Sequence, residues 1–422
     1  MSQPALLNRT HQSAFLDNLQ TVISSAGAAS VGLLVVQLKS INDLNLALGY
    51  RTVDAALSLL ASRLAEGFST RTRVVRVGTG RFAIVLDALK SEAHALLAAN
   101  KVQRLVEAPF DVQGCKVKID VVQGVALFPQ HAANGEDLFR CAEGALDLAK
   151  NQQAAVVLYS PEKVSELNEL HRIDGELTRA LEHGGLEVVF QPQIELRTGR
   201  PTGAEALLRC RDRDGAPIPP QLLIQAAERT QRLPQVMAAV LNTALRYAAE
   251  WPDPLLGLSV NASADNFKHP DFVASIESAS SIWNRAPGML TVEVTESAFI
   301  DEPEKTFATM RCLRNLGVRV SIDDFGTGYS SLSYFKDIPA NELKVDKSFV
   351  IGMVNHEADR GIVRTIINLA HAFGLQVVAE GVEDEATLDM LRSMDCDVVQ
   401  GFLLSKPLEP ASFLDWLRSH SG

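Results

Sequence analysis

Several features are scarce in this 422-residue sequence, and each scarcity excludes a class of protein. The five cysteines are scattered, odd in number and without paired spacing, which predicts reduced thiols and argues against a disulfide framework or a zinc site. Residues 1–15 contain no basic segment followed by an apolar core, so we expect no signal peptide. The longest strongly apolar run, Val31–Leu38, is too short to span a bilayer. These absences predict a cytoplasmic protein without direct membrane insertion.

Positive charge is also scarce, because 40 lysines and arginines face 51 aspartates and glutamates and leave a net charge of −11. Such a chain is not expected to coat a nucleic-acid polymer. An anionic substrate would need local attraction, which bound metal ions supply. The hydrophobic content of 46% is that of a globular protein, and the length exceeds what one core usually holds, so we expect two domains.

One stretch has a composition that core packing does not require. The β-branched run Val318–Ile322 ends in two adjacent carboxylates, Asp323 and Asp324, and a loop rich in glycine and serine follows at 326–331. Adjacent carboxylates at a strand end repel each other unless a divalent cation neutralises them. Two cations bridged by one carboxylate are the layout of phosphoester hydrolysis. The residues alone therefore indicate a metal-dependent hydrolase.

The first part of the chain, residues 1–160, alternates short apolar runs with helical patterns and predicts an α+β domain. After a polar lead-in, we expect strands and helices in this order: strand Val31–Leu38, helix Leu44–Leu64, a hairpin of Val74–Val77 and Phe82–Leu86, helix Glu92–Val106, strand Val117–Phe128, helix Glu136–Lys150 and a last run Ala154–Tyr159. Residues 161–185 carry an apolar stripe at helical spacing and end in Gly184-Gly185, which predicts a linker helix.

The second part, residues 186–422, predicts an α/β barrel of TIM type, a (β/α)8 fold. Eight β-rich runs alternate with helical segments: Val188–Gln191, Gly203–Leu208, Leu256–Asn261, Leu290–Val294, Val318–Ile322, Glu342–Val345, Gln376–Ala379 and Val398–Gly401. Carboxylates or metal-capable amides end most of these runs. Taken singly, such residues are usually solvated caps. Taken together they would converge on one rim, where uncompensated negative charge is destabilising.

The order of elements over residues 15–160, with Asn45, Gly49 and Asp54 at fixed spacing, resembles the GGDEF domain of diguanylate cyclases. The family's Gly-Gly-Asp-Glu-Phe motif aligns with residues 78–82, which read Gly-Thr-Gly-Arg-Phe in this chain. Three further family positions also differ: a metal-binding aspartate aligns with Gln37, a phosphate-binding arginine with Ala154, and the inhibitory Arg-x-x-Asp site with Ser-Thr-Arg-Thr at 69–72. Because Gln37 and Arg81 cannot hold Mg²⁺ as carboxylates do, the resemblance implies a degenerate, regulatory or structural domain without cyclase activity.

Two residues that align with guanine-contacting positions of that family, Asn45 and Asp54, are still present. The resemblance therefore leaves a regulatory GTP site open. The alternative is that Asn45 is an ordinary polar residue near a helix start and that Asp54 lies on the solvated face of that helix.

A second set of motifs, over residues 171–417, resembles the EAL domain of cyclic di-GMP phosphodiesterases. The motifs stand in the family's order: Glu205-Ala-Leu-Leu-Arg209, Asn261, Glu293-Val-Thr-Glu296, Asp323-Asp-Phe-Gly-Thr-Gly328, Lys344-Val-Asp346, Glu380-Gly-Val-Glu383 and Gln400-Gly401. One tripeptide alone would be a weak signal, but the full set is specific. The resemblance implies hydrolysis of cyclic di-GMP to linear pGpG and, at the family level, a homodimer.

The resemblance also implies a role for each residue. Glu205, Asn261, Glu293 and Asp323 would bind one Mg²⁺ or Mn²⁺, and Asp323 would bridge to a second ion held by Asp324. Glu380 would be the general base, Lys344 with Asp346 would act on water and phosphate, and Gln400 would position the second ion or its water. Glu296 would tether the loop after Asp323, while Gln191, Arg209 and Glu383 would lie at the substrate.

Departures from that family's pattern are few. Phe190, Cys210 and the pair Gln231-Arg232 replace the usual Tyr, Trp and Gly-Leu, and none of them removes a metal ligand. The alternative function is a receptor that binds cyclic di-GMP without hydrolysis and signals to a protein partner. A bifunctional cyclase and phosphodiesterase is poorly supported, because Gln37 and Arg81 replace the cyclase carboxylates.

Overall fold

The computed structural model describes residues 4–26, 29–68, 72–112, 114–296, 298, 302–326 and 337–420. The predicted loop residues 327–331, and residues 69–71 of the degenerate inhibitory segment, lie outside these ranges. The chain separates into two compact units, Met1–Glu169 and Leu170–Gly422. No helix of the described residues combines the length and the apolar character that a membrane crossing requires.

The first unit is an antiparallel sheet with one parallel pair, covered by helices on both faces. Its strands are β1 (Ser30–Leu38), β2 (Arg73–Gly78), β3 (Arg81–Leu89), β6 (Val121–Phe128) and β7 (Val156–Leu158), in the spatial order β2-β3-β1-β6-β7. A small hairpin of β4 (Phe110–Val112) and β5 (Cys115–Val117) stands apart from this sheet. The helices of the first unit are α1 (Pro4–Ala26), α2 (Ile41–Leu48), α3 (Tyr50–Gly67), α4 (Glu92–Glu107) and α5 (Gly135–Asn151).

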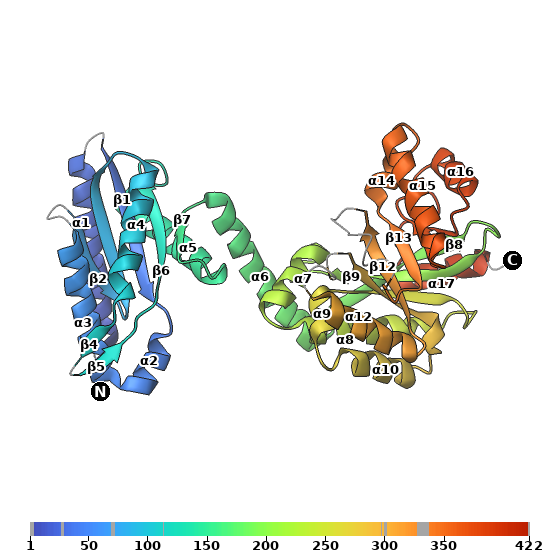
Figure 1. The fold of residues 1–422 in the computed structure, drawn as a ribbon, viewed down its shortest axis with the longest axis horizontal. Helices are drawn as coiled ribbons and strands as arrows, with labels where there is room; N and C mark the ends of the chain where they lie inside the picture. Colours follow the sequence, from blue (N-terminus) through green and yellow to red (C-terminus); the bar gives the residue numbers. More distant parts are fainter. Residues whose placement is uncertain are drawn as a thin grey trace. The chain divides into compact units, whose positions relative to one another are not determined.

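Alternation along β1 explains why helices cover both faces of this sheet (Figure 1). Leu34 and Val36 pack with α3 and α4, whereas Leu33 and Val35 pack with α1 and α5. Gly124 in β6 allows α5 to approach closely, since a Cβ there would lie 2.2 Å from the carbonyl oxygen of Ala142.

Three expectations for the first unit were wrong in detail. The lead-in contains α1, whose buried face includes Phe15, Leu19 and Val22. The predicted helix Leu44–Leu64 is interrupted at Gly49, which has φ +80° and separates α2 from α3. The predicted strand Val117–Phe128 is two strands, because the chain turns between β5 and β6. The hairpin and the other helices form as predicted.

Helix α6 (Pro161–His183) follows β7, and the division between the two compact units falls within it, after Glu169. Its apolar stripe continues into the second unit, where Ile173 and Leu177 are fully buried in the core.

The second unit is a closed eight-stranded barrel. Its strands are β8 (Leu186–Glu195), β9 (Pro201–Cys210), β10 (Gly257–Ala262), β11 (Leu290–Thr295), β12 (Arg319–Phe325), β13 (Glu342–Val345), β14 (Gln376–Ala379) and β15 (Val398–Val399). Its described helices are α7 (Pro220–Arg229), α8 (Leu233–Ala248), α9 (Ala264–Lys268), α10 (Phe272–Ile282), α12 (Pro303–Asn315), α14 (Lys347–Gly352), α15 (Glu357–Ala372), α16 (Glu385–Ser393) and α17 (Pro410–His420), with a 3₁₀ turn η1 (Pro287–Met289). The eight predicted runs are thereby confirmed as the eight strands of a barrel.

The barrel departs from an all-parallel TIM barrel at one strand. β8 pairs antiparallel with both of its neighbours, β9 and β15, while β9 to β15 run parallel. The long β8 and β9 form a hairpin in continuous register from Leu186 to Gln193, with a shift before Ile194, and the connection between them is short and needs no crossover helix. This hairpin places Gln191 directly opposite Glu205.

Candidate active site

Each strand of the barrel brings at least one polar side chain to the same rim, either from the strand itself or from the residue directly after it. These residues are Gln191 on β8, Glu205 on β9, Asn261 on β10, Glu293 on β11, Asp323 on β12 and Lys344 on β13, with Glu380 and Gln400 directly after β14 and β15. Strand alternation explains the arrangement, because Leu343 and Val345 on either side of Lys344 pack outward into the apolar core. The C-terminal ends of barrel strands are where such folds carry their chemistry.

Lys344 lies at the centre of this rim, with only 1% of its side chain exposed. Its Nζ is 2.5 Å from Glu380, 2.7 Å from Glu293, 3.3 Å from Asp323 and 3.5 Å from Glu205. Burial alone would lower the pKa of the Lys344 ammonium, but the carboxylates, Asp323 foremost, raise it well above its usual value. Lys344 is therefore a fixed positive charge that compensates only part of the surrounding negative charge.

The carboxyl groups respond to this shortage of positive charge. Burial, then repulsion from Glu205, raises the pKa of Glu293 well above its usual value. Burial, only partly offset by Lys344, raises the pKa of Glu380 to about 7. Burial, then the charge of Asp323, raises the pKa of Asp324 to about 6. One lysine cannot keep all of these groups ionised, and a further cation would lower their pKa values.

Amide side chains hold Glu205 in place. Asn261 Nδ2 donates to Glu205 Oε1 at 2.6 Å, and Gln400 Nε2 donates to Glu205 Oε2 at 2.7 Å. Burial opposes ionisation of Glu205, but Lys344 and these hydrogen bonds lower its pKa. Gln400 Nε2 also donates to Gln191 Oε1 at 3.1 Å, and Gln400 Oε1 accepts from Gln193 at 3.0 Å.

Gln193 is a member of this network that the sequence interpretation missed. It is buried and lies two residues from Gln191 on β8, so the two side chains share one face of the strand. The period of two along β8 was a signal that could have found it.

A group of three carboxylates fits a divalent cation. Oxygens of Asp323, Asp324 and Glu380 all lie within 4.8 Å of one another. Oxygens that share one ion at Mg²⁺ or Ca²⁺ bond lengths lie at most about 5 Å apart. Asp324 has φ +55°, a left-handed conformation that is costly for a residue other than glycine. Such strain is common where a functional group must point in one direction.

The other predicted site residues lie around the edge of this cluster. Glu296 Oε2 accepts from the backbone N–H of Gly326 at 3.0 Å, and the Glu296 N–H donates to the Asp323 carbonyl at 3.1 Å, so Glu296 holds the described start of the loop after β12. Asp346 accepts from the Ser348 N–H at 2.9 Å and caps α14. Within the described part of the chain, the exposed Glu383 makes no hydrogen bond or ion pair with the cluster.

A groove of about 750 Å³ opens beside the cluster. Arg209 and Asn261 line one side of it, and helix α7 lines the other with Gln221, Ile224 and Glu228. Arg209, four residues after Glu205 on β9, brings a cationic side chain to the groove.

Comparison with known proteins identifies the barrel. Residues 174–407 match the EAL domain family, which is more than half of the chain. The chain belongs to the EAL domain family. Residues 5–155 match the diguanylate cyclase GGDEF domain, so a GGDEF domain precedes the EAL domain.

Two relatives from Pseudomonas aeruginosa are longer proteins that align with most of this chain. The bifunctional diguanylate cyclase/cyclic di-GMP phosphodiesterase MucR is 32% identical over 380 residues, which are 89% of this chain and 55% of MucR. The cyclic di-GMP phosphodiesterase NbdA is 31% identical over 429 residues, covering 99% of this chain and 54% of NbdA. This chain therefore spans about half the length of these relatives.

A solved structure supports the assignment of the EAL domain. The phosphodiesterase PaMucR in complex with c-di-GMP is 36% identical and has a TM-score of 0.55, covering 57% of this chain and 99% of that one. The covered share of this chain is close to the share that the EAL domain family matches.

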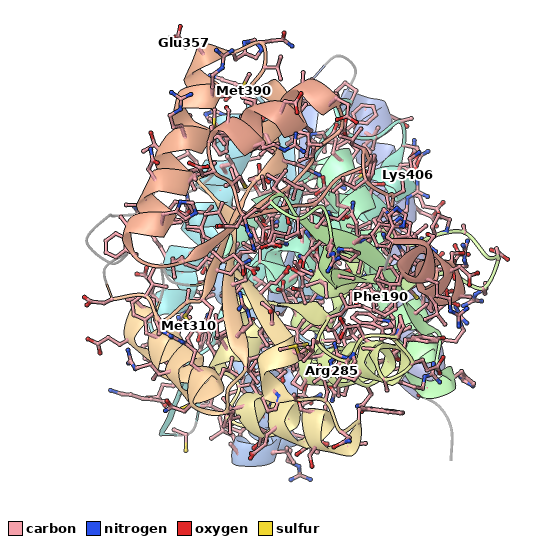
Figure 2. The ribbon with its side chains drawn as sticks, turned by 90° about the vertical axis from the view of Figure 1, so that its right-hand side faces the viewer. Phe190, Arg285, Met310, Glu357, Met390 and Lys406 are labelled. Atoms are coloured by element: carbon pink, nitrogen blue, oxygen red, sulfur yellow. The ribbon has the colours of Figure 1, made fainter. Side chains whose placement is uncertain are left out.

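The three departures from the EAL pattern are accommodated locally. Phe190, labelled in Figure 2, is fully buried. Its ring packs edge-on against Tyr247 and Trp251 and tilted against Phe413. Cys210 is buried in the same core. Gln231 has φ +56°, the conformation that glycine adopts most easily, which explains the glycine of the family pattern at this position.

The GGDEF domain has replaced its carboxylate pair by an internal ion pair. Arg81 Nη1 lies 2.5 Å from Glu143, and Arg81 Nη2 donates to Gln37 Oε1 at 2.9 Å. Asn45 and Asp54 lie on α2 and α3, and Asp54 forms a 3.5 Å ion pair with Arg76 in which both side chains are largely exposed. The structure thus places Asp54 on a solvated helix face, as the alternative to a GTP site predicts.

Proposed function

We propose that this chain hydrolyses cyclic di-GMP to linear pGpG in its EAL domain, using two Mg²⁺ or Mn²⁺ ions. The observation that carries this proposal is the rim of carboxylates whose negative charge a single buried Lys344 leaves undercompensated. The relatives MucR and NbdA are named as cyclic di-GMP phosphodiesterases, and the PaMucR structure holds c-di-GMP. Eight of the aligned polar residues lie on one rim, which supports hydrolysis at one site: Gln191, Glu205, Asn261, Glu293, Asp323, Lys344, Glu380 and Gln400.

The ligand set is made of oxygen atoms, which suits Mg²⁺ and Mn²⁺. One ion would be held by Glu205, Asn261, Glu293 and Asp323, and the other by Asp323 and Asp324. Asn261 donates its Nδ2 to Glu205, which leaves its Oδ1 for a cation. When bound, such a pair of ions polarises the phosphodiester and acidifies water.

The remaining residues act on protons, charge and position. Glu380 accepts the proton of the attacking water, and Lys344 stabilises the negative charge that develops on the phosphoryl oxygens. Gln400 and Glu296 keep Glu205 and the loop after Asp323 in position through the hydrogen bonds described above. Asp346 lies beside Asp324. After burial and the charge of Asp323, the charge of Asp346 also raises the pKa of Asp324.

Substrate contacts are assigned to the groove beside the cluster. Arg209 lines the groove and would bind a phosphate of cyclic di-GMP with its guanidinium. Gln191, held by Gln400, would contact the substrate at the opposite side of Glu205, and Glu383 would do so from the exposed loop after β14. A homodimer is a family-level expectation, and a GTP effect would require the nucleotide site at Asn45 and Asp54 that the exposed ion pair of Asp54 argues against.

The test is to incubate the purified chain with cyclic di-GMP and Mg²⁺ or Mn²⁺ and to separate the nucleotides by chromatography. We expect pGpG in the presence of either ion and none after chelation. The matched control for ligand variants is Asp415→Asn, which removes a carboxylate from the exposed pair with Arg418 on α17 and should leave turnover intact. Tight binding of cyclic di-GMP without pGpG would contradict the proposal and would identify the chain as a receptor.

A further inference from the structure

Helix α6 contacts the chain on both sides of helix α7. Ahead of α7, Arg179 Nη2 donates to the Arg211 carbonyl at 2.8 Å, and Glu176 Oε1 accepts from Arg213 Nε at 3.0 Å. Glu176 is a buried carboxylate, which also pairs with Arg179 at 2.9 Å. The segment that leads from β9 into α7 is therefore attached to α6 by two arginines and a buried acid.

The C-terminal end of α7 is also attached to α6. Asp174 of α6 pairs with Arg229, the last residue of α7, and both side chains are mostly buried. In the turn after α7, Arg232 donates to Thr178 Oγ1, one turn of α6 further on. Arg232 stands where the EAL pattern has leucine, so this contact comes from one of the departures noted above.

Helix α7 is the wall of the substrate groove. Its residues Gln221, Ile224 and Glu228 line the groove across from Arg209 and Asn261. Its opposite side is packed into the core through other residues of the helix, namely Leu223, Ala226 and Ala227. A shift of α7 along or away from the groove would change the groove's width without touching the carboxylate cluster.

Helix α6 is itself a firm support. Ile173, Leu177 and Ala180 are buried in the barrel core, on the same half of α6 that carries Asp174 and Glu176. The ion pairs are thus not needed to hold α6 on the barrel, and their geometry bears on α7 instead.

We propose that Asp174 and Glu176 of α6 are positioning residues for the substrate groove. Asp174 fixes the C-terminal end of α7 through Arg229, and Glu176 fixes the loop that leads into α7 through Arg213. This inference rests on the proposed function, because the groove is taken to bind cyclic di-GMP. It assigns a role in substrate binding to a helix that contributes no group to the rim. Helix α6 begins in the first compact unit, which ends at Glu169. A change in α6 would therefore act on the EAL domain first through α7 and the loop before it.

The test removes one carboxylate charge of α6 at a time in the full chain. Asp174→Asn removes the ion pair with Arg229 at the C-terminal end of α7, and Glu176→Gln removes the ion pair with Arg213 in the loop before α7. We expect KM for cyclic di-GMP to rise about fivefold, the lower end of typical coupling between sites, while kcat changes less than twofold, on the order of experimental scatter. The swap Asp174→Arg with Arg229→Asp should restore most of the wild-type KM. The matched control is Asp389→Asn, which breaks an exposed Asp–Arg pair on α16, a helix outside the groove.

Hydrogen exchange supplies a readout that does not depend on turnover. The backbone amides of α7 should exchange faster in both variants, and those of α12 should not change. Unchanged KM together with unchanged exchange in α7 would overturn the inference, and so would a loss confined to kcat. If the wild-type chain does not hydrolyse cyclic di-GMP, the proposed function fails, and exchange in α7 alone decides the inference.

Discussion

Arg81 in the GGDEF domain and Lys344 in the EAL domain are both cationic side chains that pair with acids at a sheet, yet their surroundings differ in charge. Arg81 contacts one carboxylate, Glu143, and one amide, Gln37, and each side chain of the ion pair is 32% exposed. Lys344 is 1% exposed and contacts four carboxylates within 3.5 Å. The first centre is neutral by itself, and the second carries an excess of negative charge.

The two centres therefore differ in whether they need a bound cation. In the GGDEF domain the guanidinium of Arg81 satisfies Glu143 without any bound ion, so the fold is stable and the site has no need of a metal. In the EAL domain burial is the largest cause that raises the pKa values of Glu293, Glu380 and Asp324, and repulsion between neighbouring carboxylates adds to it. Burial raises the pKa of Glu143 as well, but there the charge of Arg81 opposes it. A cluster of ionisable side chains with such perturbed pKa values is a candidate functional site.

The largest expected effect comes from changing the charge of the EAL centre. Asp323→Asn removes the carboxylate that we assign to both ions, and we expect turnover of cyclic di-GMP to fall by about a thousandfold. The fold should persist, since Lys344 keeps three other carboxylate partners. Chromatography of pGpG and circular dichroism measure the two quantities, and retained turnover in a folded variant would refute the assignment of Asp323.

A change of ion tests the same centre without a mutation. Ca²⁺ prefers longer bonds and more ligands than Mg²⁺, so replacing Mg²⁺ by Ca²⁺ should reduce turnover on the order of a hundredfold. Cyclic di-GMP binding, measured by calorimetry, should be retained in Ca²⁺. Full activity in Ca²⁺ alone would contradict the geometry proposed for Asp323, Asp324 and Glu380.

A variant of the neutral centre should affect stability and leave hydrolysis unchanged. Arg81→Ala leaves Glu143 without its ion-pair partner and Gln37 Oε1 without its donor. We expect the free energy of unfolding of the GGDEF domain to fall by about 1 kcal/mol, the usual size for a partly exposed hydrogen-bonded pair. Denaturant unfolding measures this loss, and a gain in stability would show that the pair is strained.

The smallest expected effect concerns GTP. Because Asp54 is engaged with Arg76 on an exposed helix face, we expect GTP at up to millimolar concentration to leave the rate of cyclic di-GMP hydrolysis unchanged. The parallel assay for cyclic di-GMP synthesis from GTP should also be negative, since Gln37 and Arg81 replace carboxylates. A rate change that Asp54→Ala abolishes would instead establish a nucleotide site at Asn45 and Asp54.

Sequence reasoning was most successful where a property repeats along the chain. Each of the eight barrel strands is a short apolar run, and the polar residue that follows or ends it is visible in the sequence, as Asp323 and Lys344 illustrate. It was less successful where a segment mixes signals. The face of α1 that carries Phe15 and Leu19 is interspersed with polar residues, and the break at Gly49 lies inside a helical pattern.

The sequence by itself determined the order of the domains, the residues available at the rim and the loss of carboxylates in the GGDEF domain, because these depend on residue identity and local spacing. Only the tertiary structure decided that β8 runs antiparallel and that Gln193 joins Gln400, because strand direction depends on pairing between distant segments. The contacts of α6 with the loop before α7 and with the C-terminal end of α7 were decided in the same way. They join residues between 32 and 55 positions apart, a separation that no local pattern encodes.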